Sequence, residues 1–316
     1  MGVGADGPRQ SPEALLARLK TPLHDLVTTL FPALCRVCDE PLLRSGRVPV
    51  CAQCLSAPKP PRGLCCQVCG DALGFENERI AGGLPRAEQL CTPCRMAPPA
   101  FRRAVATSIY DGPTRELLHL LKYDGVRSLA RPLGGMLAEA IAQLVPELDA
   151  EAETLLVPVP LFRVRRRERG FNQAALLMDE ARAVLRRRYP KLRLRSAPEA
   201  MERTRATESQ FALNPAQRRR NVRGAFAVPR PAVVLGRDVV LIDDIYTTGA
   251  TARACAQALE RAGARAVWVA TIARAQPETV ALWDSDGAGA AGAGAGRATA
   301  DGGSFGGAVL WDGGAT

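Results

Sequence analysis

Residues 239–259 decide the fold, and they read VVLIDDIYTTGATARACAQAL. The first four residues are aliphatic, as in a buried strand, and two acids, Asp243 and Asp244, follow them directly. A short loop of threonine and glycine then opens an amphipathic helix. Ligands of open α/β sheets lie at the carboxyl ends of the strands, where this acid pair falls. The stretch therefore predicts a parallel sheet with a ligand site behind this strand.

The loop after the acid pair has the composition of a phosphate site. Its residues are Thr247, Thr248, Gly249, Ala250 and Thr251. Successive backbone N–H groups and the N-terminus of the next helix can point at a phosphate, and glycine lacks the Cβ that would block its approach. The two carboxylates would repel a phosphate, so they suit sugar hydroxyls beside it. A ribose 5-phosphate fits both halves, and the alternative is an acid-capped turn that enters an ordinary helix.

Strand and helix patterns alternate on both sides of this stretch. Strands are predicted at AVATSIY (104–110), TLLVPVP (154–160) and AVWVATIA (266–273), and helices at PTRELLHLLKY (113–123) and NQAALLMDEARAVLRRR (172–188). Strands separated by helices indicate βαβ units. The predicted fold class is therefore α/β, with a parallel sheet flanked by helices.

Four CxxC pairs precede this α/β region. They are Cys35/Cys38, Cys51/Cys54, Cys66/Cys69 and Cys91/Cys94. Each pair can place two sulfurs on a tetrahedral ion, and two pairs complete a closed structural site. The module therefore predicts two structural Zn²⁺ ions, and the alternative is that the cysteines are merely small buried hydrophobic residues.

An internal repeat indicates which pairs share an ion. CRVCDEPL at 35 is similar to CQVCGDAL at 66, and CAQCLSAP at 51 is similar to CTPCRMAP at 91. This order is typical of a duplicated ribbon, so we expect the first two pairs on one zinc and the last two on another, with a cross-braced arrangement as the alternative. Cys65 or Cys66 can be the ligand, and the two-residue gap favours Cys66. Cys255 is expected in the core.

Net charge and hydropathy indicate the class of ligand and the location of the protein. The formal net charge is +10, and eight thiolates on two Zn²⁺ ions would reduce it to about +6. The excess lies in arginine clusters, which suit phosphates or nucleic acid. No apolar run approaches the roughly 20 residues that cross a bilayer, so no membrane insertion is expected. The start MGVGADGPRQ has no secretory signal pattern, which favours a cytoplasmic location.

Several further segments carry a family resemblance. They are LKY at 121, VPVPLFRVRRRERGFNQAALL at 157, RTRATESQFAL at 203 and RRRNVRGAFAV at 218. With the acid pair and its T-T-G-x-T loop, they resemble the ComF/GntX family of type I phosphoribosyltransferase-like proteins with an N-terminal zinc ribbon. The resemblance covers about residues 30 to 275. Many members have one ribbon, so two ribbons are a departure.

The resemblance implies binding of phosphoribosyl pyrophosphate (PRPP) with Mg²⁺. Asp243 and Asp244 would hold the ribose 2′- and 3′-hydroxyls, and residues 247–251 the 5′-phosphate. The loop after the strand at 154–160 and a mobile loop at 200–221 would contact the pyrophosphate. The candidates for that contact are Lys122, Arg163, Arg169, Arg203 and Arg205. His119, the histidine nearest Lys122, is expected to be structural.

Two functions follow from the resemblance. The first is transfer of a phosphoribosyl group from PRPP to an acceptor, with release of pyrophosphate. The alternative is a non-catalytic PRPP- or nucleic-acid-binding accessory protein in DNA uptake, with single-stranded DNA or competence proteins as partners.

The expected organisation is a disordered leader (1–10), an N-terminal helix (11–34), a zinc-ribbon module (35–98), a phosphoribosyltransferase-like domain (99–275) and a disordered tail (284–316).

Overall fold

The computed structural model describes residues 33–42, 47–61, 63–73, 89–206 and 215–276. The expected leader at 1–10 and tail at 284–316 lie outside these residues, as does nearly all of the expected helix at 11–34. Leu34, at the end of that range, forms an isolated antiparallel bridge with Pro41 instead of a helical turn.

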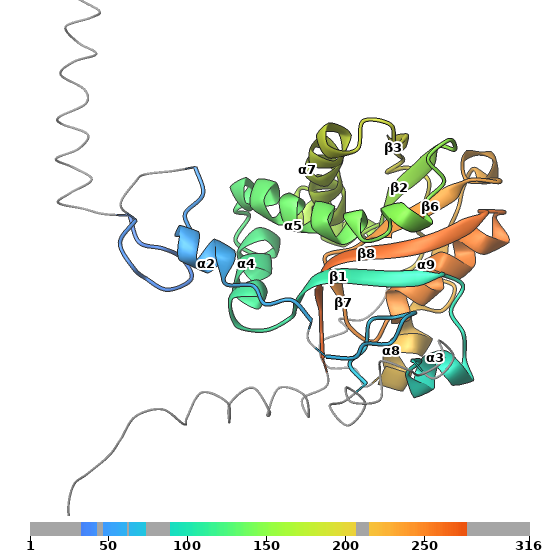
Figure 1. Cartoon of the computed structure of the whole chain (residues 1–316), viewed down its shortest axis with the longest axis horizontal. Helices are drawn as coiled ribbons and strands as arrows, with labels where there is room; N and C mark the ends of the chain where they lie inside the picture. The colour runs from blue at the N-terminus through green and yellow to red at the C-terminus, as the bar shows by residue number, and fades with distance from the viewer. Residues whose placement is uncertain (1–32, 43–46, 62, 74–88, 207–214, 277–316) are drawn as a thin grey trace, which may run out of the picture.

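A parallel sheet forms the centre of the protein (Figure 1). Its strands lie in the order β1 (Arg103–Ile109), β8 (Ala266–Arg274), β6 (Asp238–Ile242), β2 (Thr154–Pro158) and β3 (Leu194–Ser196), and β7 (Ile245–Tyr246) also pairs with β8. Every residue of β2, β6 and β8 is buried. These strands are mostly apolar on both faces because helices cover both faces of the sheet.

The helices divide between the two faces (Figure 1). One face carries α5 (Ala130–Ala142) and α7 (Gln173–Arg188), and the other carries α9 (Ala250–Arg261) with α8 (Pro215–Val222) beside it. Helices α5 and α7 approach closely at Gly134, where a Cβ would lie 2.4 Å from Cβ of Glu180. The α/β fold class is confirmed.

The cysteine module is a structural duplication. The bridge between Leu34 and Pro41 recurs as a bridge between Cys65 and Ala72. A short helix then begins directly after the third cysteine of each set, α2 (Ala52–Ser56) and α3 (Thr92–Met96). The two ribbons pack on opposite sides of the sheet: Cys35 and Cys54 join the core that contains α5 and α7, whereas the cysteines of the second ribbon join the core that contains α9.

The strands and helices predicted within the described part of the chain are present, and the structure adds elements that the sequence patterns did not predict. The predicted helix at 113–123 is α4 (Gly112–Lys122). The arginine-rich segment expected as a loop after β2 is helical, α6 (Arg163–Arg169). The expected mobile loop contains strand β4 (Glu202–Arg203), which pairs with β5 (Phe226–Ala227), and most of α8. Short 3₁₀ turns are η3 (Arg127–Leu129), η4 (Val145–Glu147) and η6 (Pro231–Val233).

Candidate functional site

The acid pair lies where β6 ends. The backbone N–H of Asp243 donates to Ala270 O at 3.2 Å, and Asp244 O accepts from the N–H groups of Ile272 and Ala273. The backbone of the pair is therefore fixed by the neighbouring strand β8. The backbone N–H of Asp244 also donates to Oδ1 of Asp243 at 2.9 Å. This edge of the sheet is the one at which open α/β proteins bind ligands.

Lys122 reaches the acid pair from the end of α4. Its Nζ lies 2.8 Å from Oδ2 of Asp244, and the two side chains are only 14% and 6% exposed. Desolvation alone would lower the pKa of Lys122, but Asp244 and Asp243 raise it above its ordinary value. The cation therefore stays charged inside the site. Desolvation, with the neighbouring charge of Asp244, raises the pKa of Asp243 to about 7.

The loop after the acid pair turns through a left-handed glycine. Gly249 has φ +72° and precedes the first residue of α9. A Cβ at this position would lie 2.1 Å from Oη of Tyr246, so the loop backbone rests directly on that ring. Only glycine suits both the backbone angle and this close approach. The backbone N–H groups of the loop precede a twelve-residue helix, as in an anion site.

A cavity of about 610 Å³ joins the acid pair, this loop and α4. Thr247, Gly249, Ala250 and Thr251 line the cavity together with both acids, whereas Thr248 does not. Oγ1 of Thr248 is buried and has no hydrogen-bond partner among the described residues. The cavity has the size of a small-molecule site, for which about 300 to 1,000 Å³ is usual.

Helix α4 lines the opposite wall with Lys122, a predicted site residue, and with three residues that the sequence analysis did not assign to a site. Arg115, His119, Lys122 and Tyr123 all face the cavity, and the rings of His119 and Tyr123 lie 4.6 Å apart. The sequence analysis expected a structural role for His119 and did not predict that this side chain lines the cavity. The signal was available, because positions 115, 119 and 122 fall on one face of a helix.

The structure separates the four arginines expected near a pyrophosphate. Arg169 stacks on Tyr123, with its Cζ 5.0 Å from the ring centroid. Because Tyr123 lines the cavity, the Tyr123 side chain lies between Arg169 and the cavity. Arg203 stacks on Phe226. Its pKa is lowered chiefly by desolvation and also by Arg165, while Asp243 acts in the opposite direction.

The other two arginines are placed differently. Arg163 begins α6 and is exposed. Arg205 donates from Nη2 to the carbonyl oxygens of Asn221 and Arg223, at 3.0 and 3.1 Å. It therefore fixes the end of α8. None of the four predicted arginines is among the described residues that line the cavity.

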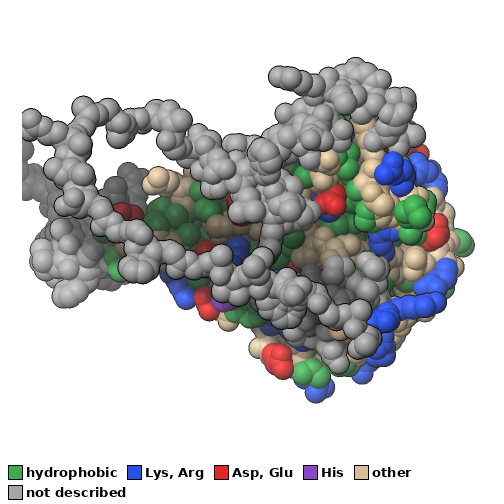
Figure 2. Space-filling model, turned by 90° about the horizontal axis from the view of Figure 1, so that it is seen from below, with side chains coloured by type: hydrophobic (Ala, Val, Ile, Leu, Met, Phe, Trp, Pro, Cys, Tyr) green, Lys and Arg blue, Asp and Glu red, His purple; other side chains and the backbone are tan. Residues whose placement is uncertain are grey.

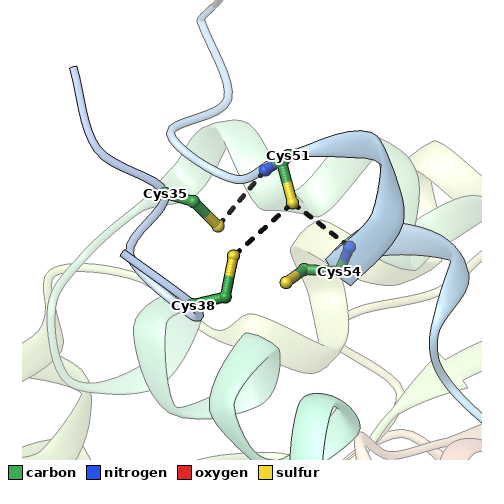
Figure 3. Close-up of side chains that lie close together, drawn as sticks. All are labelled: Cys35, Cys38, Cys51 and Cys54. Atoms are coloured by element: carbon green, nitrogen blue, oxygen red, sulfur yellow. Dashed lines mark hydrogen bonds between the residues drawn. The ribbon is translucent and has the colours of Figure 1, made fainter. Parts of the chain in front are cut away.

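The eight paired cysteines form two clusters in the sequential order. Cys35, Cys38, Cys51 and Cys54 make one, and the second consists of Cys66, Cys69, Cys91 and Cys94, with the sulfurs of each set within 4.8 Å of one another. Figure 3 shows the four sulfurs of the first cluster converging on one point. The cross-braced alternative is not formed.

The donor sets fit zinc. Tetrahedral Zn–S bonds of about 2.3 Å place the sulfurs about 3.8 Å apart. Sγ of Cys38 and Sγ of Cys51 are 3.8 Å apart in the first cluster, and Sγ of Cys69 and Sγ of Cys91 are 3.5 Å apart in the second. Cys65 is not a member, because its thiol donates to Gly63 O. The clusters are therefore suited to two structural zinc ions.

Together, the sheet, the site and the cysteine clusters define an α/β protein of the type I phosphoribosyltransferase-like class with an N-terminal zinc-ribbon module. No family model matches the chain. The DNA utilization protein YhgH of Escherichia coli (strain K12) is 33% identical over 243 residues, which cover 77% of this chain and 97% of that protein.

Two further relatives are more distant. Competence protein F of Haemophilus influenzae is 29% identical over 189 residues, covering 59% of this chain and 79% of the relative. Competence protein ComFC of Bacillus subtilis is 27% identical over 224 residues, covering 68% of this chain and 79% of the relative. The chain belongs to the ComF family. In the part of the chain that the structure describes, no helix is long and apolar enough to span a membrane.

Proposed function

We propose that this protein binds PRPP, as its Mg²⁺ complex, in the cavity between α4 and the loop at 247–251. The observation that carries the proposal is the acid pair at the end of β6, paired with Lys122 and followed by the left-handed turn at Gly249 that opens α9. The carboxylates accept hydrogen bonds from the two ribose hydroxyls. The backbone N–H groups of the loop donate to the 5′-phosphate.

The cations around the acid pair suit the pyrophosphate. Lys122 lies at the acid pair, and Arg203 lies close enough to Asp243 for the two charges to interact. In phosphoribosyl transfer the C1–O bond to pyrophosphate breaks, a bond from the acceptor to C1 forms, and the acceptor loses one proton. Fixed cations stabilise the negative charge that develops on the departing pyrophosphate. Mg²⁺ carried by PRPP adds to this stabilisation.

Titration calorimetry with PRPP and Mg²⁺ tests the binding step. Asp244→Asn removes the negative charge of the group that accepts hydrogen bonds from ribose, but it keeps a side-chain oxygen as an acceptor for Lys122. Asp244→Ala would remove that acceptor as well and leave the buried cation without it. PRPP affinity should fall about 10- to 150-fold, as for the loss of a charge-assisted hydrogen bond. Inorganic phosphate, which has no ribose, should bind unchanged.

Asp149→Asn is the matched control, because Asp149 is a carboxylate that pairs with Arg265 away from the cavity. It should leave PRPP affinity at the wild-type value. Absence of PRPP binding by the wild-type protein would overturn the proposal. Pyrophosphate release in the presence of a panel of bases and amines tests the transfer step, and release that no acceptor stimulates would count against catalysis.

A second candidate function is DNA binding in DNA uptake, for which the relatives' names are the first support. Lys and Arg side chains gather along one side of the molecule in Figure 2. Exposed arginines of α6 and α7 add positive charge at the surface: Arg163, Arg166, Arg167, Arg186 and Arg187.

Phosphate contacts by such arginines would make affinity for single-stranded DNA fall steeply with salt, with a slope of about −0.7 per contact on a logarithmic plot. A gel-shift series from low to physiological salt measures this slope. A flat response would refute DNA binding through these arginines, and it would leave the PRPP proposal standing.

A further inference from the structure

The second cysteine cluster is connected to the candidate phosphate loop by a buried arginine. Arg274, the last residue of β8, is only 5% exposed. Its Nη2 lies 3.7 Å from Sγ of Cys69 and 3.1 Å from Oδ1 of Asp71, both in the second ribbon. Its guanidinium also stacks on Tyr246, with Cζ 4.4 Å from the ring centroid. One side chain therefore contacts a metal ligand and the residue directly before the loop.

Tyr246 transmits this contact to the loop backbone. It is 5% exposed and pairs with Arg274 in the register of β7 and β8. The ring is enclosed on another side by Phe101, edge-to-face at 6.3 Å. Its hydroxyl lies against Cα of Gly249, where a Cβ would meet it at 2.1 Å. A displacement of Arg274 would therefore change the surface on which the loop turns.

A second arginine makes an independent connection on the other side of the loop. The backbone N–H of Arg253 donates to Gly249 O at 2.9 Å and so closes the first turn of α9. Its guanidinium donates from Nη2 to Sγ of Cys94 at 3.4 Å and from Nη1 to Ala97 O at 2.6 Å. The second cluster thus contacts residues on both sides of the segment 247–251.

The charges of the side chains around the second cluster fit a cluster that holds Zn²⁺. Four thiolates on one Zn²⁺ carry a net charge of about −2, and hydrogen bonds to the sulfurs stabilise that charge. The two guanidinium groups supply two positive charges beside it. Loss of the metal with protonation of the freed thiolates removes this anionic partner from both arginines, and Arg274 keeps only Asp71 among the described acids.

We propose that Arg274 and Arg253 are positioning residues that couple zinc occupancy of the second cluster to the conformation of the loop at 247–251. The consequence for ligands rests on the proposed function: zinc at the second cluster strengthens phosphate and PRPP binding at the loop. Coupling of this kind is reciprocal, so a ligand at the loop raises the zinc affinity of the second cluster by the same factor.

Hydrogen exchange tests the coupling without any ligand. In the zinc-loaded full-length protein, Arg274→Gln and Arg253→Gln should each speed amide exchange in peptides that cover residues 246–253. Peptides that cover α4 should exchange at the wild-type rate. Arg188→Gln is the matched control, because Arg188 also pairs with an acid, Glu139, but lies on α7. Unchanged exchange at 246–253 in both variants would overturn the proposal, and so would equal acceleration in the control.

Zinc release supplies a readout that general loosening of the fold would not produce. In equilibrium competition with a chromogenic chelator, PRPP with Mg²⁺ should protect one of the two zinc equivalents by raising its affinity about 5- to 150-fold, as for a typical coupling. Arg274→Gln should abolish this protection, and Arg188→Gln should keep it. Wild-type protein that binds PRPP without such protection would overturn the coupling. Wild-type protein that does not bind PRPP would overturn the proposed function instead, and the exchange experiment would still decide the coupling.

Discussion

The two cysteine clusters have the same local structure and different surroundings. In both, the first knuckle is closed by the same hydrogen bonds, from Cys35 N to Glu40 O in one and from Cys66 N to Asp71 O in the other. Cys38 of the first cluster is exposed, whereas all four cysteines of the second are buried. Backbone N–H groups of Cys51 and Cys54 donate to sulfurs of the first cluster, while arginine side chains donate to those of the second.

The difference shows how a duplicated module acquires two roles. The first ribbon packs beside α4, where Arg36 pairs with Asp124 at 3.2 Å (Figure 1). Because α4 also carries Lys122, the first ribbon supports the cationic wall of the cavity. The second ribbon packs under the loop at 247–251. Each copy therefore contacts an element on a different side of one cavity.

The largest difference is expected from removing one zinc ligand in each cluster. Cys94→Ser removes a buried ligand together with the partner of Arg253, so we expect a loss of unfolding free energy of more than about 4 kcal/mol, a size usual for loss of a structural metal. Cys38→Ser removes an exposed ligand and should have a clearly smaller effect. Urea denaturation followed by circular dichroism measures both losses.

Elemental analysis of the same proteins gives the stoichiometry. The wild type should carry two Zn²⁺ per chain, and each variant should lose only the ion of its own cluster. Equal destabilisation by the two substitutions would break the comparison between the clusters, and one zinc in the wild type would refute the two-site assignment.

The next effect concerns the turn beside the second cluster. Gly249→Ala and Gly236→Ala both place alanine at a left-handed position, with φ +72° and +67°. Nothing lies within 4 Å of a Cβ at Gly236, whereas a Cβ at Gly249 meets Oη of the enclosed Tyr246. Gly236→Ala should therefore cost about 1 to 2 kcal/mol from backbone conformation alone, and Gly249→Ala should cost more and also weaken phosphate binding.

Thermal unfolding and phosphate titration of both variants give the two quantities. The difference between the variants isolates the contact with Tyr246. Equal stability and equal phosphate affinity would show that the loop does not depend on that contact.

Much of this architecture follows from the sequence because local patterns carry it. The strand before Asp243, the helix after Gly249 and the order of the CxxC pairs each depend on residues close together in the chain. The sequential clusters follow from the repeat, since a duplicated ribbon retains its own pairing. The helix α6 was missed because its arginines indicate a charged loop as well as a helix.

Local sequence patterns could not predict the contacts that connect the parts of the site. Lys122 meets Asp244 across more than a hundred residues, and Arg274 meets Cys69 across 205. Neither pair has a periodicity or spacing that would indicate it. The resemblance supplied candidate residues near the pyrophosphate, but only the three-dimensional arrangement shows that Arg205 is bonded to backbone carbonyls.

The two acids of the pair have different surroundings, and this difference gives a pH-dependent prediction. Asp244 pairs with Lys122, whereas Asp243 has a pKa raised to about 7 by desolvation and by Asp244. Since the pKa in the unfolded chain is about 3.9, the folded state binds this proton more tightly, and stability falls as pH rises from about 4 to about 7. Asp243→Asn removes that cost and should raise the melting temperature at pH 8 by a few degrees, on the order of 1 kcal/mol.

The gain from Asp243→Asn should shrink as the pH is lowered towards 5. Melting curves at pH 5 and pH 8 for the wild type and the variant test this sign. A variant that is less stable than the wild type at pH 8 would contradict it. The same substitution should weaken PRPP binding, as expected where a binding site is kept at the expense of stability.

The smallest effect is expected at the surface of the first ribbon. Arg36 and Asp124 are 44% and 35% exposed, so their ion pair is screened by solvent and should contribute only about 0 to 1 kcal/mol. Arg36→Gln should therefore change urea stability by no more than that, and the change should vanish at high salt. Arg274→Gln removes a buried guanidinium that contacts Cys69, Asp71 and Tyr246 together, so its effect should be several times larger and persist in salt. Denaturation of both variants at low and high ionic strength measures the contrast, and comparable losses would mean that the first ribbon is held to α4 as firmly as the second is held to the loop.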